Sequence, residues 1–339
     1  MIDPRLDLAF GDQPPDGDVL ILGAGGQAGL GCFDPARSLL VQGQFADHQA
    51  LTAQGWTVVT EPPEGQVFDI ALVCLPRAKA EAHALIHAAS RRLRPGGALW
   101  IDGQKTDGVD SLLKDLRKRA EIVEQHSKAH GRIFRIDRPE GDWLPDEWAA
   151  QPHTVDGGFV TVPGVFSADG VDPGSALLVR HLPKRLPTRM VDLGAGWGWL
   201  AAQVLARDGV SQLHLVEADH AALGCARQNV TDPRASFHWA DARDFALPEP
   251  VNGVVMNPPF HIGRAADPGL GTAFIATAAR LLTGAGRLWM VANRHLPYET
   301  ALTRHFSRVE EIGGDARFKI IEATGAQQSK GRGSKGGKG

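Results

Sequence analysis

Short apolar runs that end in glycine turns alternate along the chain with longer stretches rich in Ala, Leu and Arg. Runs such as 19–22 and 68–76 are short and rich in aliphatic residues, which is typical of buried strands. Stretches such as 79–93 and 271–282 are long enough to form helices. Alternating strands and helices predict parallel sheets with crossover helices, and therefore the α/β fold class.

This order of signals occurs twice, which indicates an internal duplication. In each set an apolar run enters a glycine turn and two further apolar runs follow. The sets are 19–29, 68–76 and 95–101, and then 190–198, 254–259 and 284–290. A chain of 339 residues is too long for one typical core and about right for two. The sequence therefore predicts two tandem Rossmann-like domains.

Turn and breaker residues predict the domain boundaries. A Pro- and Gly-containing stretch begins at Pro139, and a turn at 156–158 before the alternating residues 159–162 predicts a hairpin. The final residues are rich in Gly, Ser and Lys and cannot bury apolar area, so we expect a disordered tail that touches RNA or merely aids solubility. The predicted division is 1–138 for the first domain, 139–150 for a linker, 151–324 for the second domain and 325–339 for the tail.

Charge and composition narrow the classes of function. The chain carries 36 Lys and Arg against 39 Asp and Glu, which excludes a protein that coats nucleic acid with its whole surface. Residues 77–138 hold 14 basic against 8 acidic residues, which fits either a local RNA contact or a solvated helix face. The sequence shows neither a leader nor an apolar run that could span a membrane, and we expect a cytoplasmic monomer.

Neither the cysteines nor the histidines indicate a metal site. Cys32, Cys74 and Cys225 are far apart and lack the spacing of metal ligands, and the 13 histidines are scattered along the chain. We therefore expect reduced thiols and no metal.

A glycine turn in the second domain predicts a ligand site. The strand 190–193, which includes Asp192, runs into a turn with glycines at 194, 196 and 198. Such a turn at the carboxyl end of a parallel strand lets the backbone approach a ligand closely. The turn alone is not specific, because dinucleotide enzymes use a related one and other proteins use it only for packing.

Two acids at later strand ends make this signal more specific. Glu217 lies 23 residues after Gly194, a spacing that suits an acid accepting both ribose hydroxyl hydrogens. Asp241 ends the next strand, where it can accept from an adenine amino group. Each acid alone could be a turn or cap residue, but three acids at successive strand ends predict a nucleoside-containing cofactor. The predicted cofactor-binding residues are Asp192, Gly194, Ala195, Gly196, Gly198, Glu217, Ala218, Asp241, Ala242 and Asn257.

The tetrapeptide Asn257, Pro258, Pro259, Phe260 follows the apolar strand 253–256 and is the candidate catalytic motif. The Asn257 amide oxygen and the Pro258 carbonyl can accept the hydrogens of an exocyclic base amine, whose lone pair is otherwise delocalised into the ring. Prolines have no N–H and fix the backbone, while Phe260 can stack on an extruded base. The alternative is an ordinary turn. Because no cysteine is near in sequence, we expect positioning rather than covalent catalysis.

At these residues the chain resembles the class I S-adenosylmethionine-dependent methyltransferases with a small-domain core. It resembles most closely the RsmC-like small-subunit rRNA guanine-N2 methyltransferases. The likeness covers most of the second domain, in segments 166–175, 194–198, 257–261, 291–298 and 317–319. The resemblance implies S-adenosylmethionine as cofactor and ribosomal RNA or a ribosomal subunit particle as partner. It further implies methylation of a guanine N2, with 16S rRNA as the first expectation.

The first domain resembles the decayed duplicate domain of that family, most visibly at 103–109 and 129–132. Ile21 stands where Asp192 stands in the second domain, and 74–77 replaces the Asn-Pro-Pro-Phe motif. The resemblance implies that this degenerate domain aids folding and RNA binding, and we expect it not to catalyse methylation.

Other functions stay open on the sequence. Adenine-N6 methyltransferases share variants of Asn-Pro-Pro-Phe, and targets in 16S and 23S rRNA are not separable. The turn at 23–29 has dinucleotide character, which favours a nicotinamide-dependent oxidoreductase, although 40–60 offers no clear strand ending in an acid at the ribose spacing. A noncatalytic RNA-binding protein with two decayed domains is the third possibility, and the intact motifs of the second domain argue against it.

Overall fold

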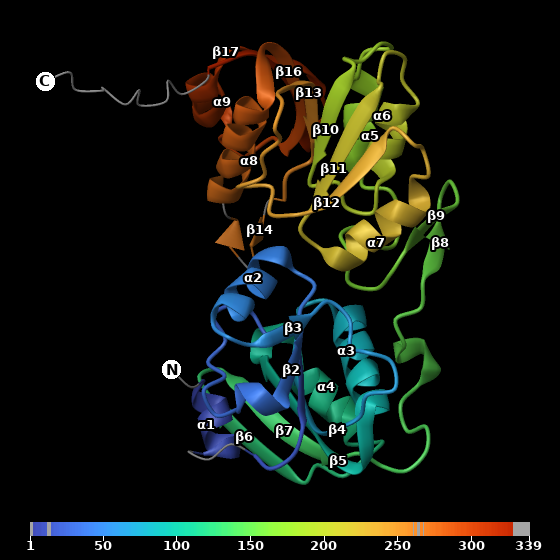
Figure 1. The fold of residues 1–339 in the computed structure, drawn as a ribbon, viewed down its shortest axis with the longest axis vertical. Helices are drawn as coiled ribbons and strands as arrows, with labels where there is room; N and C mark the ends of the chain where they lie inside the picture. The colour runs from blue at the N-terminus through green and yellow to red at the C-terminus, as the bar shows by residue number, and fades with distance from the viewer. Residues whose placement is uncertain (1–2, 12–14, 260, 263–264, 267, 328–339) are drawn as a thin grey trace, which may run out of the picture. The chain divides into compact units, whose positions relative to one another are not determined.

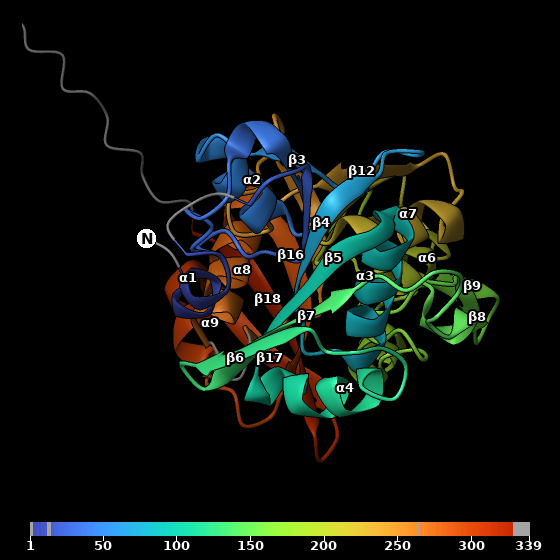
Figure 2. The same cartoon turned by 90° about the horizontal axis from the view of Figure 1, so that it is seen from below.

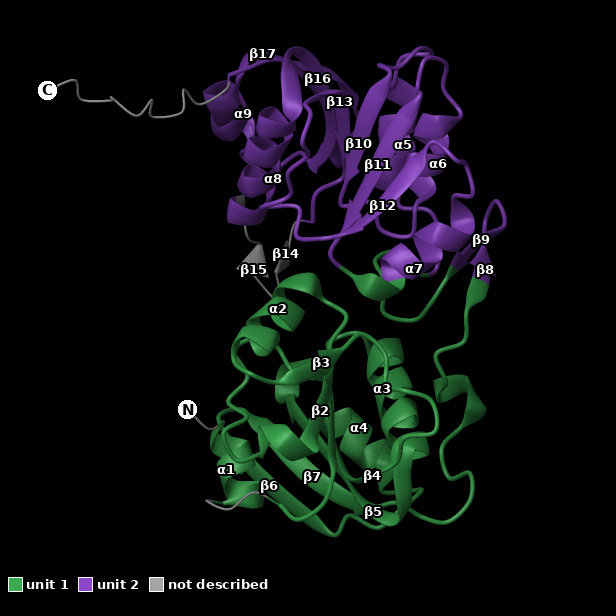
Figure 3. Ribbon diagram, in the orientation of Figure 1, with its two compact units in different colours: residues 1–153, 161–168, 219–221 green, residues 154–160, 169–218, 222–339 purple. Residues whose placement is uncertain are grey.

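The computed structural model describes residues 3–11, 15–259, 261–262, 265–266 and 268–327. These residues form two compact units, which we call unit 1 and unit 2 (Figure 3). Unit 1 contains the chain up to His153, Thr161–Ala168 and Asp219–Ala221, and unit 2 contains Thr154–Val160, Asp169–Ala218 and the chain from Ala222 on.

Unit 1 holds the first set of elements. Its helices are α1 (Pro4–Phe10), α2 (Phe45–Ala53), α3 (Lys79–Arg92) and α4 (Val109–Leu116), with short 3-10 turns η1 (Pro35–Arg37), η2 (Lys105–Asp107) and η3 (Asp146–Trp148). Its strands are β1 (Val19–Leu22), β2 (Ser38–Val41), β3 (Thr57–Val59), β4 (Phe68–Cys74), β5 (Leu93–Gln104), β6 (Glu124–Lys128) and β7 (Gly131–Asp137).

The second set of elements follows the hairpin of β8 (His153–Val155) and β9 (Phe159–Thr161). The helices are α5 (Pro173–His181), α6 (Trp199–Leu205), α7 (His220–Asn229), α8 (Pro268–Leu281) and α9 (Glu299–His305). The strands are β10 (Arg189–Leu193), β11 (Gln212–Glu217), β12 (Ala235–Trp239), β13 (Val251–Met256), β14 (His261–Ile262), β15 (Ala265–Ala266), β16 (Leu282–Asn293), β17 (Phe306–Gly314) and β18 (Phe318–Ala326).

Each unit is built on a seven-stranded sheet, and the two sheets have the same topology. The strand order is β3-β2-β1-β4-β5-β7-β6 in unit 1 and β12-β11-β10-β13-β16-β18-β17 in unit 2. The first five strands of each order are parallel, and β7 or β18 then runs antiparallel to both of its neighbours. The shared order confirms the predicted α/β class and the predicted duplication.

Helices cover both faces of each sheet (Figure 1). In unit 1, α1 and α2 pack on one face and α3 and α4 on the other (Figure 2). In unit 2, α8 and α9 pack on one face and α5, α6 and α7 on the other. Because both faces are covered, the central strands are apolar throughout: Val254, Val255 and Met256 of β13 are all 0% exposed. This is why continuous apolar runs mark the strands in the sequence.

The predicted hairpin forms and packs on the glycine turn of unit 2. Gly157 and Gly158 take the left-handed backbone conformation at its turn, with φ of 84° and 81°. The Asn229 side chain accepts from the Val160 N–H at 2.7 Å and donates to the Trp197 carbonyl at 2.8 Å. One α7 side chain therefore holds both the hairpin and the turn that follows β10.

The segment 139–150, predicted as a linker, packs against unit 1. Leu144 and Trp148 are 8% and 4% exposed and belong to the core under α3 and α4. The indole N–H of Trp143 donates to Ser90 Oγ at 2.8 Å. The linker prediction rested on proline and glycine, and burial of the neighbouring apolar side chains opposes a free linker.

The tail starts later than predicted, because β18 extends to Ala326. Its final residue pairs with Phe306 of β17, so residues 325 and 326 are part of the sheet. The predicted tail from residue 328 on lies outside the described residues.

Candidate active site

The glycine turn after β10 adopts a backbone that favours glycine. Gly194, Gly196 and Gly198 have φ of 81°, 55° and 89°. A Cβ at Gly198 would lie 3.2 Å from the Ala226 Cα, so α6 and α7 approach closely there. A Cβ at Gly196 would meet nothing within 4 Å, so the space beside Gly196 is open. The three glycines thus allow the left-handed backbone of the turn, and the space beside Gly196 can accommodate a ligand.

The carboxylate of Glu217 is held against this turn. Its Oε2 accepts from the Gly196 N–H at 2.7 Å and its Oε1 accepts from the Ala218 N–H at 2.8 Å. The N–H groups of Gly194 and Ala195 both donate to the carbonyl of Val216, the residue before it. Residues separated in sequence are brought together because β10 and β11 are parallel neighbours whose carboxyl ends meet at one edge of the sheet.

Asp241 lies at the same edge but is already engaged in an ion pair. The N–H of Ala240 donates to the Glu217 carbonyl at 3.0 Å, which places the end of β12 beside that of β11. Arg243 Nε donates to both carboxylate oxygens of Asp241, at 2.9 and 2.8 Å. Burial raises the pKa of Asp241, the Arg243 hydrogen bonds lower it, and the pKa lies below its ordinary value. Ala242 is 4% exposed and belongs to the core.

Asp192 is buried within the sheet. It is 0% exposed, and neither carboxylate oxygen has a hydrogen bond of ordinary geometry among the described residues. A backbone contact with Ala201 lowers its pKa, and this is the smallest of the three effects on the group. Burial, reinforced by the nearby Glu217 carboxylate, raises its pKa to about 8. Asp192 is therefore a protonated or weakly ionised acid at neutral pH, next to the turn that the sequence predicts for the cofactor.

This burial predicts a pH-dependent stability. Between about pH 4, the value for an unfolded Asp, and about pH 8, the folded chain keeps a proton that the unfolded chain has released. Stability therefore decreases as pH rises through this window. We expect Asp192→Asn to unfold at a higher temperature than wild type at pH 9, with the difference shrinking towards pH 5. Thermal unfolding without added cofactor measures this, with the exposed Asp244→Asn as the control. Equal unfolding temperatures for wild type and Asp192→Asn at every pH would show that ionisation of the buried acid does not lower the stability of the folded chain.

Asn257 follows β13 directly, and its amide has a fixed orientation. The Nδ2 group donates to Asp172 Oδ2 at 2.8 Å and to Ser175 Oγ at 2.9 Å. A carboxylate only accepts hydrogen bonds, so the nitrogen of the amide must face Asp172. The remaining group, Oδ1, is an acceptor. The amide oxygen is therefore left as an acceptor, and its role toward a substrate amine stays a prediction.

The rest of the predicted tetrapeptide is described only in part. Pro258 is buried and Pro259 is exposed. Phe260 lies outside the described residues, so its predicted stacking role stays a prediction.

Asp172 and Ser175 were missed by the sequence analysis as site residues. Both lie in the first turn of α5, where Asp172 is the N-cap and accepts from the Ser175 N–H at 2.7 Å. The pair Asp172, Pro173 is a recognisable helix-start signal, but it predicts only the helix. Asn257 is 85 residues away from Asp172 in the chain, so no local pattern connects them.

Ser175→Ala tests this orienting contact. Loss of one of the two acceptors of the Asn257 amide hydrogens should lower kcat about 10-fold, while the KM values for cofactor and RNA stay unchanged. Steady-state kinetics of methyl transfer measures both parameters, and Ser211→Ala, an exposed serine elsewhere in unit 2, is the control. A wild-type kcat for Ser175→Ala would remove Ser175 from the site.

In unit 1 the equivalent positions carry other residues. The strand registers place Ile21 at the position of Asp192, Gln42 at that of Glu217 and Cys74 at that of Asn257. Gln42 donates to the Ala24 carbonyl at 2.7 Å, so its amide bonds to the turn and does not supply a carboxylate. Burial raises the pKa of the Cys74 thiol. The structure thus agrees with the predicted replacements.

The space near Cys74 holds a buried ion pair. Arg5 Nε donates to Asp102 Oδ1 at 2.5 Å, and Arg5 is 4% exposed. Asp102 is the register partner of Cys74 on β5. An N-terminal helix therefore supplies a charged side chain to this part of unit 1.

The turn at 23–29 also differs from a dinucleotide site. Between Gly23 and β2 the chain, which the structure describes throughout, contains only η1. Dinucleotide sites bind the pyrophosphate at the N-terminus of a helix that follows the glycine turn directly. Because this helix is missing and Gln42 stands at the ribose position, the structure argues against the oxidoreductase.

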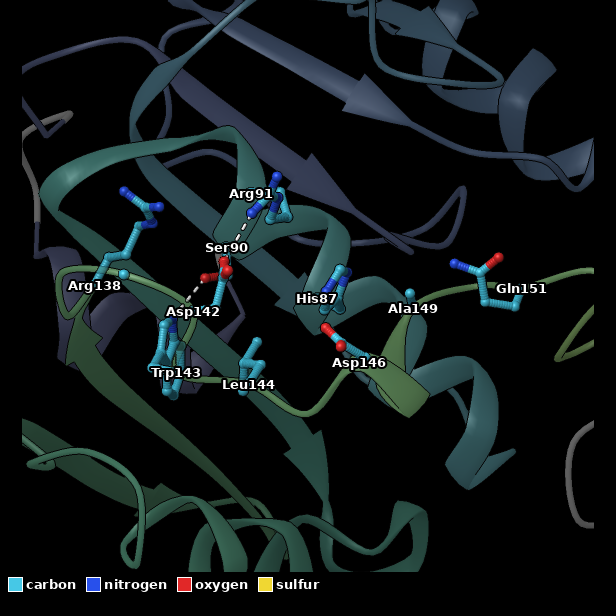
Figure 4. Close-up of a pocket in the computed structure, with 11 residues that line it drawn as sticks. His87, Ser90, Arg91, Arg138, Asp142, Trp143, Leu144, Asp146, Ala149 and Gln151 are labelled. Atoms are coloured by element: carbon cyan, nitrogen blue, oxygen red, sulfur yellow. Dashed lines mark hydrogen bonds and ion pairs between the residues drawn. The ribbon is translucent and has the colours of Figure 1, made fainter.

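A cavity of about 460 Å³ in unit 1 is lined by none of the predicted site residues (Figure 4). It lies between the end of α3 and the segment that follows β7, where Arg91 pairs with Asp142 and Trp143 bonds to Ser90. Its lining mixes cations with carboxylates and includes no glycine turn with a strand-end acid. It therefore does not offer the chemistry predicted for methyl transfer.

The described part of the chain contains no helix that combines the length and apolar character needed to cross a membrane. It contains no cluster of three or more His, Cys, Asp or Glu side chains arranged to hold a metal ion.

Comparison with known proteins assigns the family. Residues 156–322 match the methyltransferase small domain, and residues 17–139 match the methyltransferase small domain N-terminal family. The chain is 30% identical over 264 residues to ribosomal RNA small subunit methyltransferase C of Psychromonas ingrahamii, covering 75% of each chain. The chain belongs to the ribosomal RNA small subunit methyltransferase C family. The family resemblance stated from the sequence is confirmed.

Two other members agree with this assignment. The methyltransferase C of Hahella chejuensis is 29% identical over 294 residues, covering 82% of this chain and 85% of that one. A solved structure, the T. thermophilus 16S rRNA N2 G1207 methyltransferase (RsmC) in complex with AdoMet and guanosine, is 25% identical with a TM-score of 0.77. The match covers 95% of this chain and 92% of that one, so the likeness includes both units.

Proposed function

We propose that unit 2 transfers a methyl group from S-adenosylmethionine to the exocyclic N2 of a guanine in 16S rRNA. The observation that carries the proposal is the Asn257 amide, held by Asp172 and Ser175 so that Oδ1 is the acceptor. It stands at the sheet edge that also holds Glu217 and the glycine turn. Membership of the methyltransferase C family and the likeness to a structure with AdoMet and guanosine support the choice of cofactor and base.

The residues present fit S-adenosylmethionine. Glu217 offers a fixed carboxylate for ribose hydroxyls, and the space beside Gly196 is open. A cofactor that carries positive charge would favour the ionised form of the buried Asp192 side chain, whose pKa is raised in its absence. When bound, the cofactor supplies a methyl group activated by its sulfonium. Asp241 can contribute acceptor positions left over from its pair with Arg243.

The residues around Asn257 act by positioning the substrate amine. Asn257 Oδ1 and the Pro258 carbonyl accept its two hydrogens, which favours a pyramidal nitrogen whose lone pair is available. The substrate nitrogen is then the nucleophile and no enzyme intermediate forms. The cysteine of unit 2, Cys225, is 3% exposed on α7 and is not part of this edge.

Unit 1 contributes to folding and RNA binding rather than catalysis, since Gln42 and Cys74 replace the acid and the amide of unit 2. We propose a cytoplasmic monomer that acts on rRNA or on a ribosomal subunit particle. The 139–150 segment belongs with unit 1.

Transfer of label from methyl-tritiated S-adenosylmethionine tests this function. The substrates are 16S rRNA, 23S rRNA and small subunits from a strain that lacks the protein. We expect incorporation into 16S rRNA, free or within the subunit, and none into 23S rRNA. Label in 23S rRNA alone would overturn the choice of target. Lack of incorporation into any substrate would support the noncatalytic alternative instead.

A further inference from the structure

A second cavity lies at the carboxyl end of β16 in unit 2. Its volume is about 510 Å³, and it is lined by Asn293, Arg294, His295, Ala316 and Arg317. Asn293 is the last residue of β16, and Arg317 immediately precedes β18, the strand that pairs with β16. The lining thus comes from two neighbouring strands at the sheet edge that also carries Asn257. None of the cofactor-binding residues lines it.

The lining of this cavity is cationic. It contains two guanidinium groups, an imidazole and an amide, and no carboxylate. Arg294 is held in place, since it donates to the carbonyls of Asp315 and Phe318 and to Glu311 Oε1 at 3.0 Å. The carboxylate of Asp315 accepts from two backbone N–H groups, those of residues 317 and 318. Arg294 is therefore engaged within the protein, which leaves Arg317 as the arginine of the lining without an ion pair among the described residues.

Arg317 is the side chain most available to such a ligand. It is exposed, and its guanidinium carbon lies 5.2 Å from the centre of the Phe318 ring. No ion pair joins it to a carboxylate among the described residues. The amide of Asn293 likewise has no hydrogen-bond partner among them. A planar guanidinium supported on an aromatic ring keeps its N–H groups free for a bidentate acceptor.

Direct packing connects the cavity with Asn257. The first turn of α5 lies against Phe318, since a Cβ at Gly174 would be 3.3 Å from Phe318 Cε1. The same Cβ would be 3.0 Å from Asp172 Oδ2, the atom that accepts from the Asn257 amide. The chain of contacts runs from Arg317 through Phe318 and the α5 turn to Asn257. In the sheet, β16 and β10 flank β13 on opposite sides, so the cavity and the glycine turn lie on either side of Asn257.

We propose that this cavity binds a backbone phosphate of the RNA strand next to the target guanine. Arginine forks match the two free oxygens of a phosphodiester, and Arg317 offers such a fork without an ion pair to a carboxylate among the described residues. The cofactor is placed on the opposite side of β13, so the substrate strand is the ligand expected here. This inference rests on the proposed function and adds which part of the RNA substrate the cavity binds, namely a backbone phosphate. Asn293 supplies a neutral donor to the same segment.

The test is RNA affinity and its salt dependence for the full-length chain. The probe is 16S rRNA from a strain lacking the protein, in filter binding from about 50 to 200 mM KCl. Arg317→Gln should bind about 10-fold more weakly at the lowest salt and reduce the slope of log Kd against log salt by about 1. Arg317→Lys should keep the slope. Asn293→Ala should weaken binding without changing the slope, because no charge is removed.

Controls separate this inference from the proposed function. Arg304→Gln removes an exposed arginine of α9 outside the cavity and should leave affinity and slope at wild-type values. S-adenosylmethionine affinity, measured by calorimetry, should be unchanged in every variant. Wild-type affinity and slope for Arg317→Gln, with wild type still methylating rRNA, would overturn the phosphate site alone. Failure of the wild type to methylate rRNA would overturn the proposed function.

Discussion

Asn257→Ala is expected to slow methyl transfer about 1,000-fold and to leave S-adenosylmethionine affinity within about 3-fold of wild type. The reason lies in the orientation of the amide. Asp172 and Ser175 hold its nitrogen, so its oxygen is aligned before the substrate arrives and needs no reorganisation during the reaction. Alanine removes that acceptor, and water cannot restore a fixed direction for the amine hydrogens.

Single-turnover kinetics with saturating RNA and cofactor measures this effect directly, because it isolates the chemical step from binding and product release. Asn252→Ala is the matched control, since Asn252 lies near the opposite end of the same strand β13. Its rate should equal that of wild type. Methyl transfer by Asn257→Ala at the wild-type rate would show that the tetrapeptide is a structural turn.

Glu217→Ala should weaken S-adenosylmethionine binding about 100-fold, through loss of hydrogen bonds worth about 1.5 to 3 kcal/mol each to a charged acceptor. The carboxylate is already fixed by the N–H groups of Gly196 and Ala218, so binding requires little further ordering. Glu217→Gln retains one amide oxygen and the side-chain shape, and we expect a smaller loss of about 10-fold.

Isothermal titration calorimetry provides the affinity and the stoichiometry together. The control is Gln42→Ala, at the equivalent position of unit 1, which should leave both unchanged because that unit lacks the acid. One site per chain is expected for wild type. Unchanged affinity in both Glu217 variants would place the cofactor elsewhere, and loss of binding in Gln42→Ala would place it in unit 1.

Local patterns in the sequence were enough to predict which residues lie at strand ends. Gly194 to Gly198 and Glu217 lie at strand ends, and parallel pairing brings those ends to one edge. Asp172 and Ser175 could not be predicted in the same way. Their partner Asn257 lies on another element, and the contact exists only because α5 packs across the end of β13.

The departures from prediction have tertiary causes. Segment 139–150 has the composition of a linker, yet Leu144 and Trp148 find an apolar site on unit 1. Similarly, Gly325 and Ala326 belong to a glycine-rich end, but pairing with β17 keeps them in the sheet. Asp192 was predicted from its position before the turn, and its burial was not visible because strand periodicity does not give the depth of a side chain in the sheet.

The most direct test of the central claim is the identity of the methylated nucleoside. After reaction of the purified chain with S-adenosylmethionine and 16S rRNA from a strain lacking the protein, the RNA is digested to nucleosides and resolved by liquid chromatography with mass spectrometry. The account predicts N2-methylguanosine as the new product, formed by wild type and nearly lost in Asn257→Ala at the same reaction time. N6-methyladenosine, a methylated ribose, or N2-methylguanosine at the wild-type level from Asn257→Ala would contradict it.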